Sequence, residues 1–200
     1  MDSLRYFAAM LTVVIAPPFF LSWLLIHPFA AIWRKLGSAT YFFMLIFLTA
    51  SIIGLSSLYG IHEDLLYFGL NYVTAALSFP CFFLAAAMAI YYRKYLTPAI
   101  LIGLPEISQE DYPGTLLTEG IYSKIRHPRY VGAYFFILGW AFLANSPVPY
   151  MVAAALLPVI YIIVLFEERE LHKRFGSEYK QYCQEVPRYL PKIIQKPSQK

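Results

Sequence analysis

The sequence is short of charged residues. Asp, Glu, Lys and Arg make up 14% of the 200 residues, whereas 59% are hydrophobic and 18% are aromatic. A soluble domain carries about 25% charged residues, because its surface has to be covered by polar groups. So little charge is not compatible with a fully water-exposed surface, and it indicates a protein that largely faces lipid.

Cysteine is also scarce. Cys81 lies in an apolar run and Cys183 in a polar tail, so we expect no disulfide between them. No segment has the Cys/His spacing of a zinc site, and we predict no metal centre. The run His62-Glu63-Asp64 could hold a metal, but a short link between two spans is the favoured interpretation.

Long apolar runs dominate the rest of the chain. A membrane-spanning helix needs about 20 such residues. The sequence therefore predicts an all-α, polytopic transmembrane bundle of about five spans, and a polar periodic segment at 167–186 predicts a C-terminal helix outside the membrane. Two prolines, Pro17 and Pro18, are expected to kink or split the first span. The runs lie at residues 4–33, 41–59, 65–92, 130–145 and 150–166.

Basic residues are concentrated toward the C-terminus. Of the 16 Lys and Arg residues, eight follow Phe166, and only Arg5 lies on the side predicted to be external. The positive-inside rule then places the C-terminus in the cytosol. Because the basic segments flank apolar spans, membrane lipids are the expected partner rather than nucleic acid. We expect a single domain over 1–200, with three spans in 1–95 and a loop, hairpin and helix in 96–200.

Polar groups cluster where the fourth span begins. Pro128 suits the first turn of a helix, which places His127 at its N-terminal edge. Backbone N–H groups and the positive helix end favour an anionic ligand group there. Arg126 adds donors, and Tyr122 and Tyr130 offer ring faces that suit an adenine or a sulfonium cation. The alternative is flanking positive charge with a belt of tyrosines.

Two carboxylates, Glu167 and Glu168, emerge directly from the fifth span. Ionisable groups at this depth usually face protein or a cavity, and a carboxylate here could bind an amino group or balance a cation. The alternative is a solvated helix start in which Glu170 pairs with Arg174. Because spans four and five form a tight antiparallel hairpin, we predict that His127 and Glu168 lie close together.

At these two segments the chain resembles the isoprenylcysteine carboxyl methyltransferase and phospholipid methyltransferase superfamily of membrane enzymes. The resemblance covers about residues 116–191, including the tail at 186–191, and the first half matches only in spanning the membrane. The pattern is Gly-x-Tyr, Arg-His-Pro-x-Tyr-x-Gly, and Glu-Glu-x-x-Leu-x-x-x-Phe-Gly-x-x-Tyr-x-x-Tyr. It is carried by Gly120, Tyr122, Arg126, His127, Pro128, Tyr130, Gly132, Glu167, Glu168, Leu171, Phe175, Gly176, Tyr179 and Tyr182.

The resemblance implies that residues 96–200 form the catalytic half of the protein. S-adenosylmethionine would donate a methyl group at the cytosolic face to a lipophilic acceptor that enters from the bilayer. The resemblance implies catalytic roles for Glu168 and Arg126. The cofactor contacts that it implies are Gly120, Tyr122, His127, Pro128, Tyr130 and Glu167. It leaves the oligomeric state open.

Two departures from the family pattern concern the ligands, the first a contact with the cofactor and the second the substrate. Gly114 stands where members often carry a histidine, and Ile163 stands where carboxyl methyltransferases carry an arginine suited to a substrate carboxylate. The acceptor group could therefore be a carboxylate, an amine or a thiol.

Two other functions remain open from the sequence. Membrane sterol and steroid reductases, which use NADPH, have a similar segment that reads Arg-His-Pro-Asn-Tyr followed by Gly-Glu. Here Arg129 replaces the Asn and Ala133 the Glu, which favours the transferase. The second alternative is a non-catalytic membrane protein with a degenerate site.

Overall fold

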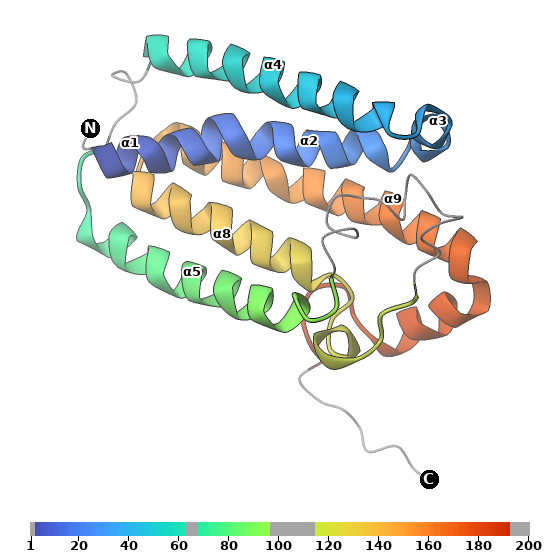
Figure 1. Cartoon of the computed structure of the whole chain (residues 1–200). Coiled ribbons are helices and arrows are strands. Elements are labelled where there is room, and N and C mark those ends of the chain that lie inside the picture. Colours follow the sequence, from blue (N-terminus) through green and yellow to red (C-terminus); the bar gives the residue numbers. More distant parts are fainter. Residues whose placement is uncertain (1–2, 63–67, 97–114, 193–200) are drawn as a thin grey trace.

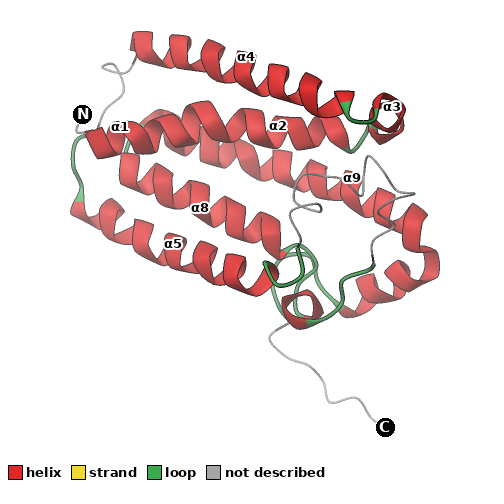
Figure 2. Cartoon of the chain, viewed as in Figure 1, coloured by secondary structure: helices red, strands yellow, loops and turns green. Residues whose placement is uncertain are grey.

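The computed structural model describes residues 3–62, 68–96 and 115–192, and every regular element in these ranges is a helix (Figure 2). The predicted all-α fold is therefore confirmed. In chain order the elements are α1 (Ser3–Met10), the π-helix η1 (Leu11–Ile15), α2 (Ala16–Ile26), α3 (Ala30–Leu36), α4 (Ala39–His62), α5 (Tyr72–Tyr92), the 3₁₀-helix η3 (Gly120–Ser123), α8 (Pro128–Ala144) and α9 (Pro147–Glu185).

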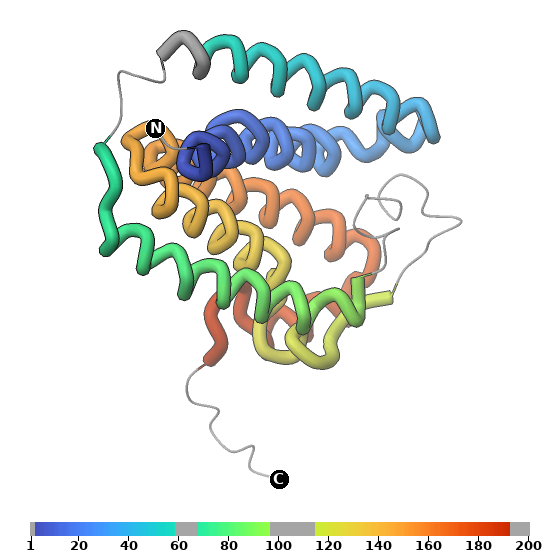
Figure 3. The backbone as a smooth tube through the Cα atoms, turned by 60° about the vertical axis from the view of Figure 1, so that its left-hand side comes forward, coloured from blue at the N-terminus to red at the C-terminus, as the bar shows by residue number. Residues whose placement is uncertain are grey.

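The long helices run side by side (Figure 1). The rod formed by α1, η1 and α2 lies between α4 on one side and α8 and α9 on the other, and α5 covers the outer face of α8 (Figures 1 and 3). Helices α4 and α5 turn apolar side chains outward, among them Phe42, Phe79 and Phe83, as expected for surfaces in contact with lipid.

The number of spans agrees with the prediction. Within the described residues, four helical segments are long and apolar enough to cross a membrane: Ser3–Ile26, Ala39–Leu58, Tyr72–Tyr92 and the helix Pro147–Glu185. The 17-residue α8 runs antiparallel to α9 within the same bundle. Its length is about 26 Å, close to the thickness of the hydrocarbon core. The chain is therefore an integral membrane protein with α8 as its additional span.

The prolines of the first span do not divide it. Pro17 and Pro18 lie in the first turn of α2, where a missing N–H costs little, and the preceding turn widens into the π-helix η1. The predicted C-terminal helix is likewise continuous with the fifth span in α9. It is interrupted only at Gly176, whose φ of 54° suits glycine, and there α9 turns back (Figure 1).

Arg5 has a structural role at the predicted outer end of the bundle. Only 2% of its surface is exposed. Its Nη2 donates to the carbonyls of Gly69 at 2.6 Å and Ala144 at 2.8 Å. Ala144 is the last residue of α8, and Asn145 caps it in the left-handed conformation. A buried cation at a helix C-terminus satisfies its free carbonyls and its dipole, so Arg5 ties α1 to the end of α8.

Glycines allow α5 to approach α8 closely. A Cβ at Gly132 would lie 3.0 Å from the Cβ of Met88, and one at Gly139 would lie 2.8 Å from the ring of Phe82. Small residues at such crossings are the usual device for packing helices in a membrane. This contact holds α5 against the helix whose N-terminal end carries the Arg-His-Pro motif.

We expect Gly139→Ala to lower the melting temperature of the purified protein in detergent, because the new Cβ collides with the Phe82 ring. The expected loss in unfolding free energy is about 1–3 kcal/mol. Gly54→Ala on α4 is the matched control, since nothing lies within 4 Å of its added Cβ. Equal melting temperatures for the two variants would contradict the close packing.

Candidate active site

The hairpin brings together the residues that the sequence predicted to be close. The carboxylate of Glu168 on α9 is 6% exposed. Its Oε1 accepts hydrogen bonds from Arg126 Nη2 at 2.7 Å, Arg126 Nε at 3.2 Å and His127 Nε2 at 3.1 Å. The predicted proximity of His127 and Glu168 is confirmed.

A third hydrogen-bond donor to Glu168, Arg188, completes the cluster. Its Nη2 donates to Glu168 Oε2 at 2.7 Å and its Nε to both carboxylate oxygens at 3.0 Å. These hydrogen bonds raise the pKa of Arg188 further above its ordinary value. No role for Arg188 was predicted from the sequence; its place in the matching tail was the available signal. We refer to Arg126, His127, Glu168 and Arg188 as the ion cluster.

Backbone contacts fix the tail that carries Arg188. The N–H of Arg126 donates to the carbonyl of Pro187 at 2.9 Å, and the N–H of His127 donates to that of Arg188 at 3.0 Å. Arg126 Nη1 also reaches the carbonyls of Cys183 at 3.0 Å and Val186 at 2.6 Å. The guanidinium of Arg126 is thus held by the side chain of Glu168, by the last turn of α9 and by the start of the tail.

Pro128 and Gly120 shape the backbone of the site. Pro128 is buried in the first turn of α8, as predicted, with His127 at the N-cap position. Gly120 begins η3 with a φ of 59°, and a Cβ there would overlap the hydroxyl of Tyr95. The Tyr95 ring packs edge-on against Tyr122, whose carbonyl accepts a hydrogen bond from the Tyr182 hydroxyl at 2.6 Å. In the structure these residues position the loop before α8.

Glu167 faces different partners from Glu168. Arg129 Nη2 lies 3.8 Å from Glu167 Oε2 and donates to the Tyr130 hydroxyl at 3.0 Å. The same guanidinium lies over the rings of Trp23, at 4.6 Å, and Tyr130, at 4.9 Å. The two adjacent carboxylates therefore lie in two environments, one in the ion cluster and one beside an arginine held between aromatic rings.

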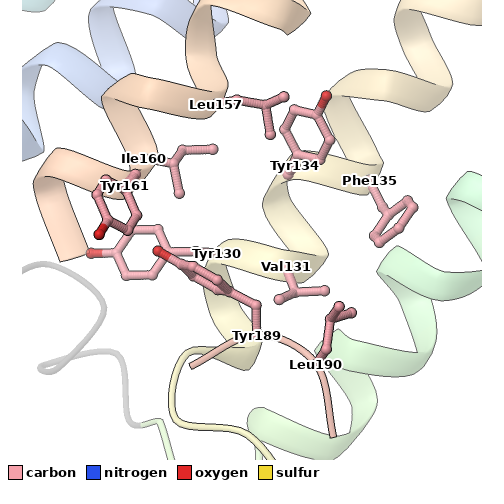
Figure 4. Close-up of a pocket in the computed structure, with 9 residues that line it drawn as sticks. All are labelled: Tyr130, Val131, Tyr134, Phe135, Leu157, Ile160, Tyr161, Tyr189 and Leu190. Atoms are coloured by element: carbon pink, nitrogen blue, oxygen red, sulfur yellow. The ribbon is translucent and has the colours of Figure 1, made fainter. Parts of the chain in front are cut away.

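An apolar pocket of about 350 Å³ lies between α8, α9 and the tail (Figure 4). Tyr130 and Tyr189 line it, and their ring centroids lie 6.0 and 6.2 Å from that of His127, so the pocket begins beside the ion cluster. Figure 4 shows these two rings gathered with Tyr161 at one end of the pocket. The remaining lining residues are Val131, Tyr134, Phe135, Leu157, Ile160 and Leu190.

The pocket has an uncharged lining and a lipid-facing side. Leu157 and Tyr161 are 50% and 45% exposed on the surface of α9. Burial raises the pKa of Tyr189 to about 12, so its phenol is neutral at physiological pH. The pocket thus joins the outer surface of the bundle to the ion cluster through neutral aromatic groups.

Of the two positions that depart from the family pattern, one lies in the core and the other lies outside the described residues. Ile163 is fully buried in the core cluster that also contains Trp23 and Tyr130, and it does not line the pocket. Gly114 falls outside the described residues. The effect of Gly114 on cofactor contacts therefore stays a prediction.

We expect Arg188→Gln to destabilise the protein by about 1 kcal/mol, because Glu168 loses a charged donor that is partly exposed to water. Thermal unfolding in detergent measures the effect. Arg169→Gln is the control, since Arg169 neighbours Glu168 in sequence but is exposed. If both variants melt together, Arg188 contributes nothing to the cluster.

Comparisons with known proteins extend over this part of the chain. The model of the phospholipid methyltransferase family matches residues 73–178. The protein-S-isoprenylcysteine O-methyltransferase of Schizosaccharomyces pombe is 28% identical over 157 residues, which cover 70% of this chain and 66% of that protein. The methanethiol S-methyltransferase 1 of Bradyrhizobium diazoefficiens is 33% identical over 85 residues, covering 42% of this chain and 29% of that protein.

A third relative, the protein-S-isoprenylcysteine O-methyltransferase of Xenopus laevis, is 37% identical over 81 residues, covering 40% of this chain and 28% of that protein. The chain thus spans less than two thirds of the length of these relatives. No solved structure matches it. The family model covers more than half of the sequence, including α5 and three of the four ion-cluster residues, so the chain belongs to the phospholipid methyltransferase family.

Proposed function

We propose that this protein transfers a methyl group from S-adenosylmethionine to a lipophilic acceptor at the cytosolic face of the membrane. The observation that carries the proposal is the ion cluster of Arg126, His127, Glu168 and Arg188 beside an apolar pocket that reaches the lipid-facing surface. Family membership supports methyl transfer, and the basic tail supports the cytosolic location.

The residues around the cluster suit the methyl donor. When bound, S-adenosylmethionine supplies an electrophilic methyl group on a sulfonium cation. The ring faces of Tyr130 and Tyr189 attract such a cation without competing for the methyl group. The N-terminal end of α8, at His127 and Pro128, favours an anionic group such as a carboxylate.

The pocket suits a lipophilic acceptor. Its volume lies at the lower end of the range of small-molecule sites. Its lining offers apolar contacts for a hydrocarbon chain, and the exposed side chains of Leu157 and Tyr161 place its outer side against lipid. An acceptor that enters there brings its reacting end to Tyr130 and Tyr189, next to His127.

The contribution of this chain to the reaction is alignment and placement of charge. Reacting atoms have to be held about 3–3.5 Å apart and in line for methyl displacement. The Glu168 carboxylate only accepts hydrogen bonds, so His127 donates to it from Nε2. Glu168 fixes the positions of Arg126 and Arg188 and offsets part of their positive charge.

We expect the purified protein to bind S-adenosylmethionine saturably, and Glu168→Gln to weaken that binding by about tenfold or more, because Arg126, His127 and Arg188 lose the negative charge of the acceptor that they share. Titration calorimetry measures the affinity. The control is Glu178→Gln, an exposed carboxylate on the same helix. Binding of NADPH without binding of S-adenosylmethionine would contradict methyl transfer and favour the reductase.

We also expect Leu157→Trp to raise the KM for a lipophilic acceptor while leaving the affinity for S-adenosylmethionine unchanged, because the larger side chain fills the pocket away from the ion cluster. Met151→Trp is the matched control: Met151 is 69% exposed on α9 and does not line the pocket. Equal acceptor kinetics for the two variants would place the acceptor elsewhere.

A further inference from the structure

The short helix α3 lies across the end of the bundle rather than along it (Figure 1). Its inner side is packed against the bundle: Ala30 is buried, and Nε1 of Trp33 donates to the carbonyl of Leu25 on α2 at 3.0 Å. The carbonyl of Trp33 accepts a hydrogen bond from the hydroxyl of Thr40, near the start of α4, at 2.9 Å. Helix α3 is therefore held between α2 and α4 in a defined orientation.

The outer surface of α3 is divided into an apolar face and a basic face. Phe29, Ile32 and Leu36 are exposed, and their spacing of three and four residues puts them on one side of the helix. Arg34 and Lys35 are also exposed, and at 100° per residue they lie on the opposite side. A helix with aromatic and aliphatic side chains on one face and basic side chains on the other suits the plane of a membrane interface.

An ion pair places α3 at the level of the lipid headgroups. Arg34 Nη2 donates to Glu170 Oε1 on α9 at 3.0 Å. Glu170 follows Phe166, the last residue of the apolar part of α9, by four residues, which is about 6 Å along the helix axis. The headgroup region of a bilayer adds about 5–7 Å to each side of the hydrocarbon core. Arg34 therefore lies where the phosphate groups of the adjacent leaflet are found.

Five cationic side chains of α3 and α9 lie near this level, with the carboxylate of Glu170 among them. On α9, residues three and four positions apart are neighbours, so the cations at 173 and 174 lie one turn beyond Glu170. None of the ion pairs between described residues involves Lys35 or Lys173. We call the five cations the basic surface; they are Arg34, Lys35, Arg169, Lys173 and Arg174.

We propose that α3 and the basic surface form a binding site for anionic phospholipids of the adjacent leaflet. The apolar face of α3 contacts the acyl chains, while Lys35 and Lys173 pair with headgroup phosphates. An anionic headgroup supplies the negative charge that Glu170 alone does not, whereas a zwitterionic headgroup brings its own cation. A lipid fits better than a soluble anion, because the basic side chains adjoin an exposed apolar face. The site involves neither the ion cluster nor the apolar pocket.

The test compares two lipids on the full chain, purified and delipidated in detergent. Dioleoylphosphatidylglycerol and dioleoylphosphatidylcholine have the same acyl chains and differ in headgroup charge, and native mass spectrometry measures how much of each is bound. We expect the anionic lipid to be preferred, and Lys35→Gln and Lys173→Gln each to lower that preference about fivefold. The preference falls as the salt concentration rises, because salt screens exposed charges.

Lys124→Gln and Lys180→Gln are the matched controls, because both side chains are exposed and neither belongs to the basic surface. Both control variants keep the preference for the anionic lipid. An equal loss in these variants would mean that only the total charge matters, and it would overturn the site. Equal competition by soluble glycerol 3-phosphate would assign the cations to a soluble anion, with the same consequence. Unchanged melting temperatures exclude loss of fold as the cause.

Spin labels test the position of α3 itself. They are attached at Ile32→Cys or Lys35→Cys in nanodiscs, with the two native cysteines replaced by Cys81→Ala and Cys183→Ser. We expect the label at position 32 to be accessible to oxygen, which dissolves in the bilayer, and the label at position 35 to a water-soluble nickel chelate. Equal access of the nickel chelate to both labels would contradict an interfacial α3. Neither measurement requires methyl transfer, so its result is independent of the proposed function.

Discussion

Glu168 is a carboxylate buried among two guanidiniums and an imidazole that come from two separate parts of the chain. Arg126 and His127 precede α8, and Arg188 follows α9. A carboxylate buried without any such partner would cost several kcal/mol, so Glu168 needs this group of donors around it. The start of α8, the end of the membrane-spanning part of α9 and the docked tail therefore depend on one another, and the mouth of the pocket keeps its shape only while this cluster is intact.

The same stretch of α9 also joins the first half of the chain to the site. Successive residues on an α-helix point about 100° apart, so Glu167, Glu168 and Glu170 reach different neighbours. Glu168 faces the ion cluster, Glu167 faces Arg129, and Glu170 faces α2 and α3 through His27 and Arg34. Helix α2 thus contacts α9 next to the ion cluster, although the family match does not include α2.

Helix length and hairpin topology were predictable from the sequence. They explain why His127 and Glu168 lie together in the site. Short antiparallel spans bring their ends to one face, so the proximity of His127 and Glu168 required no tertiary detail. Arg188 could not be placed in this way, because its contact depends on how an irregular tail docks. The contact between His27 and Glu170 could not be placed either, because it joins residues 143 positions apart in the chain.

The charge distribution also bears on the acceptor. A substrate carboxylate needs a cation near the reacting end, and the position where the resemblance predicts an arginine is Ile163, buried in the core. The pocket lining has no charged side chain, and the guanidiniums of Arg126 and Arg188 both bind Glu168. A carboxylate would have to compete with Glu168 for them. A neutral acceptor, such as a thiol or an unprotonated amine, avoids this competition and keeps the lone pair that methyl transfer needs.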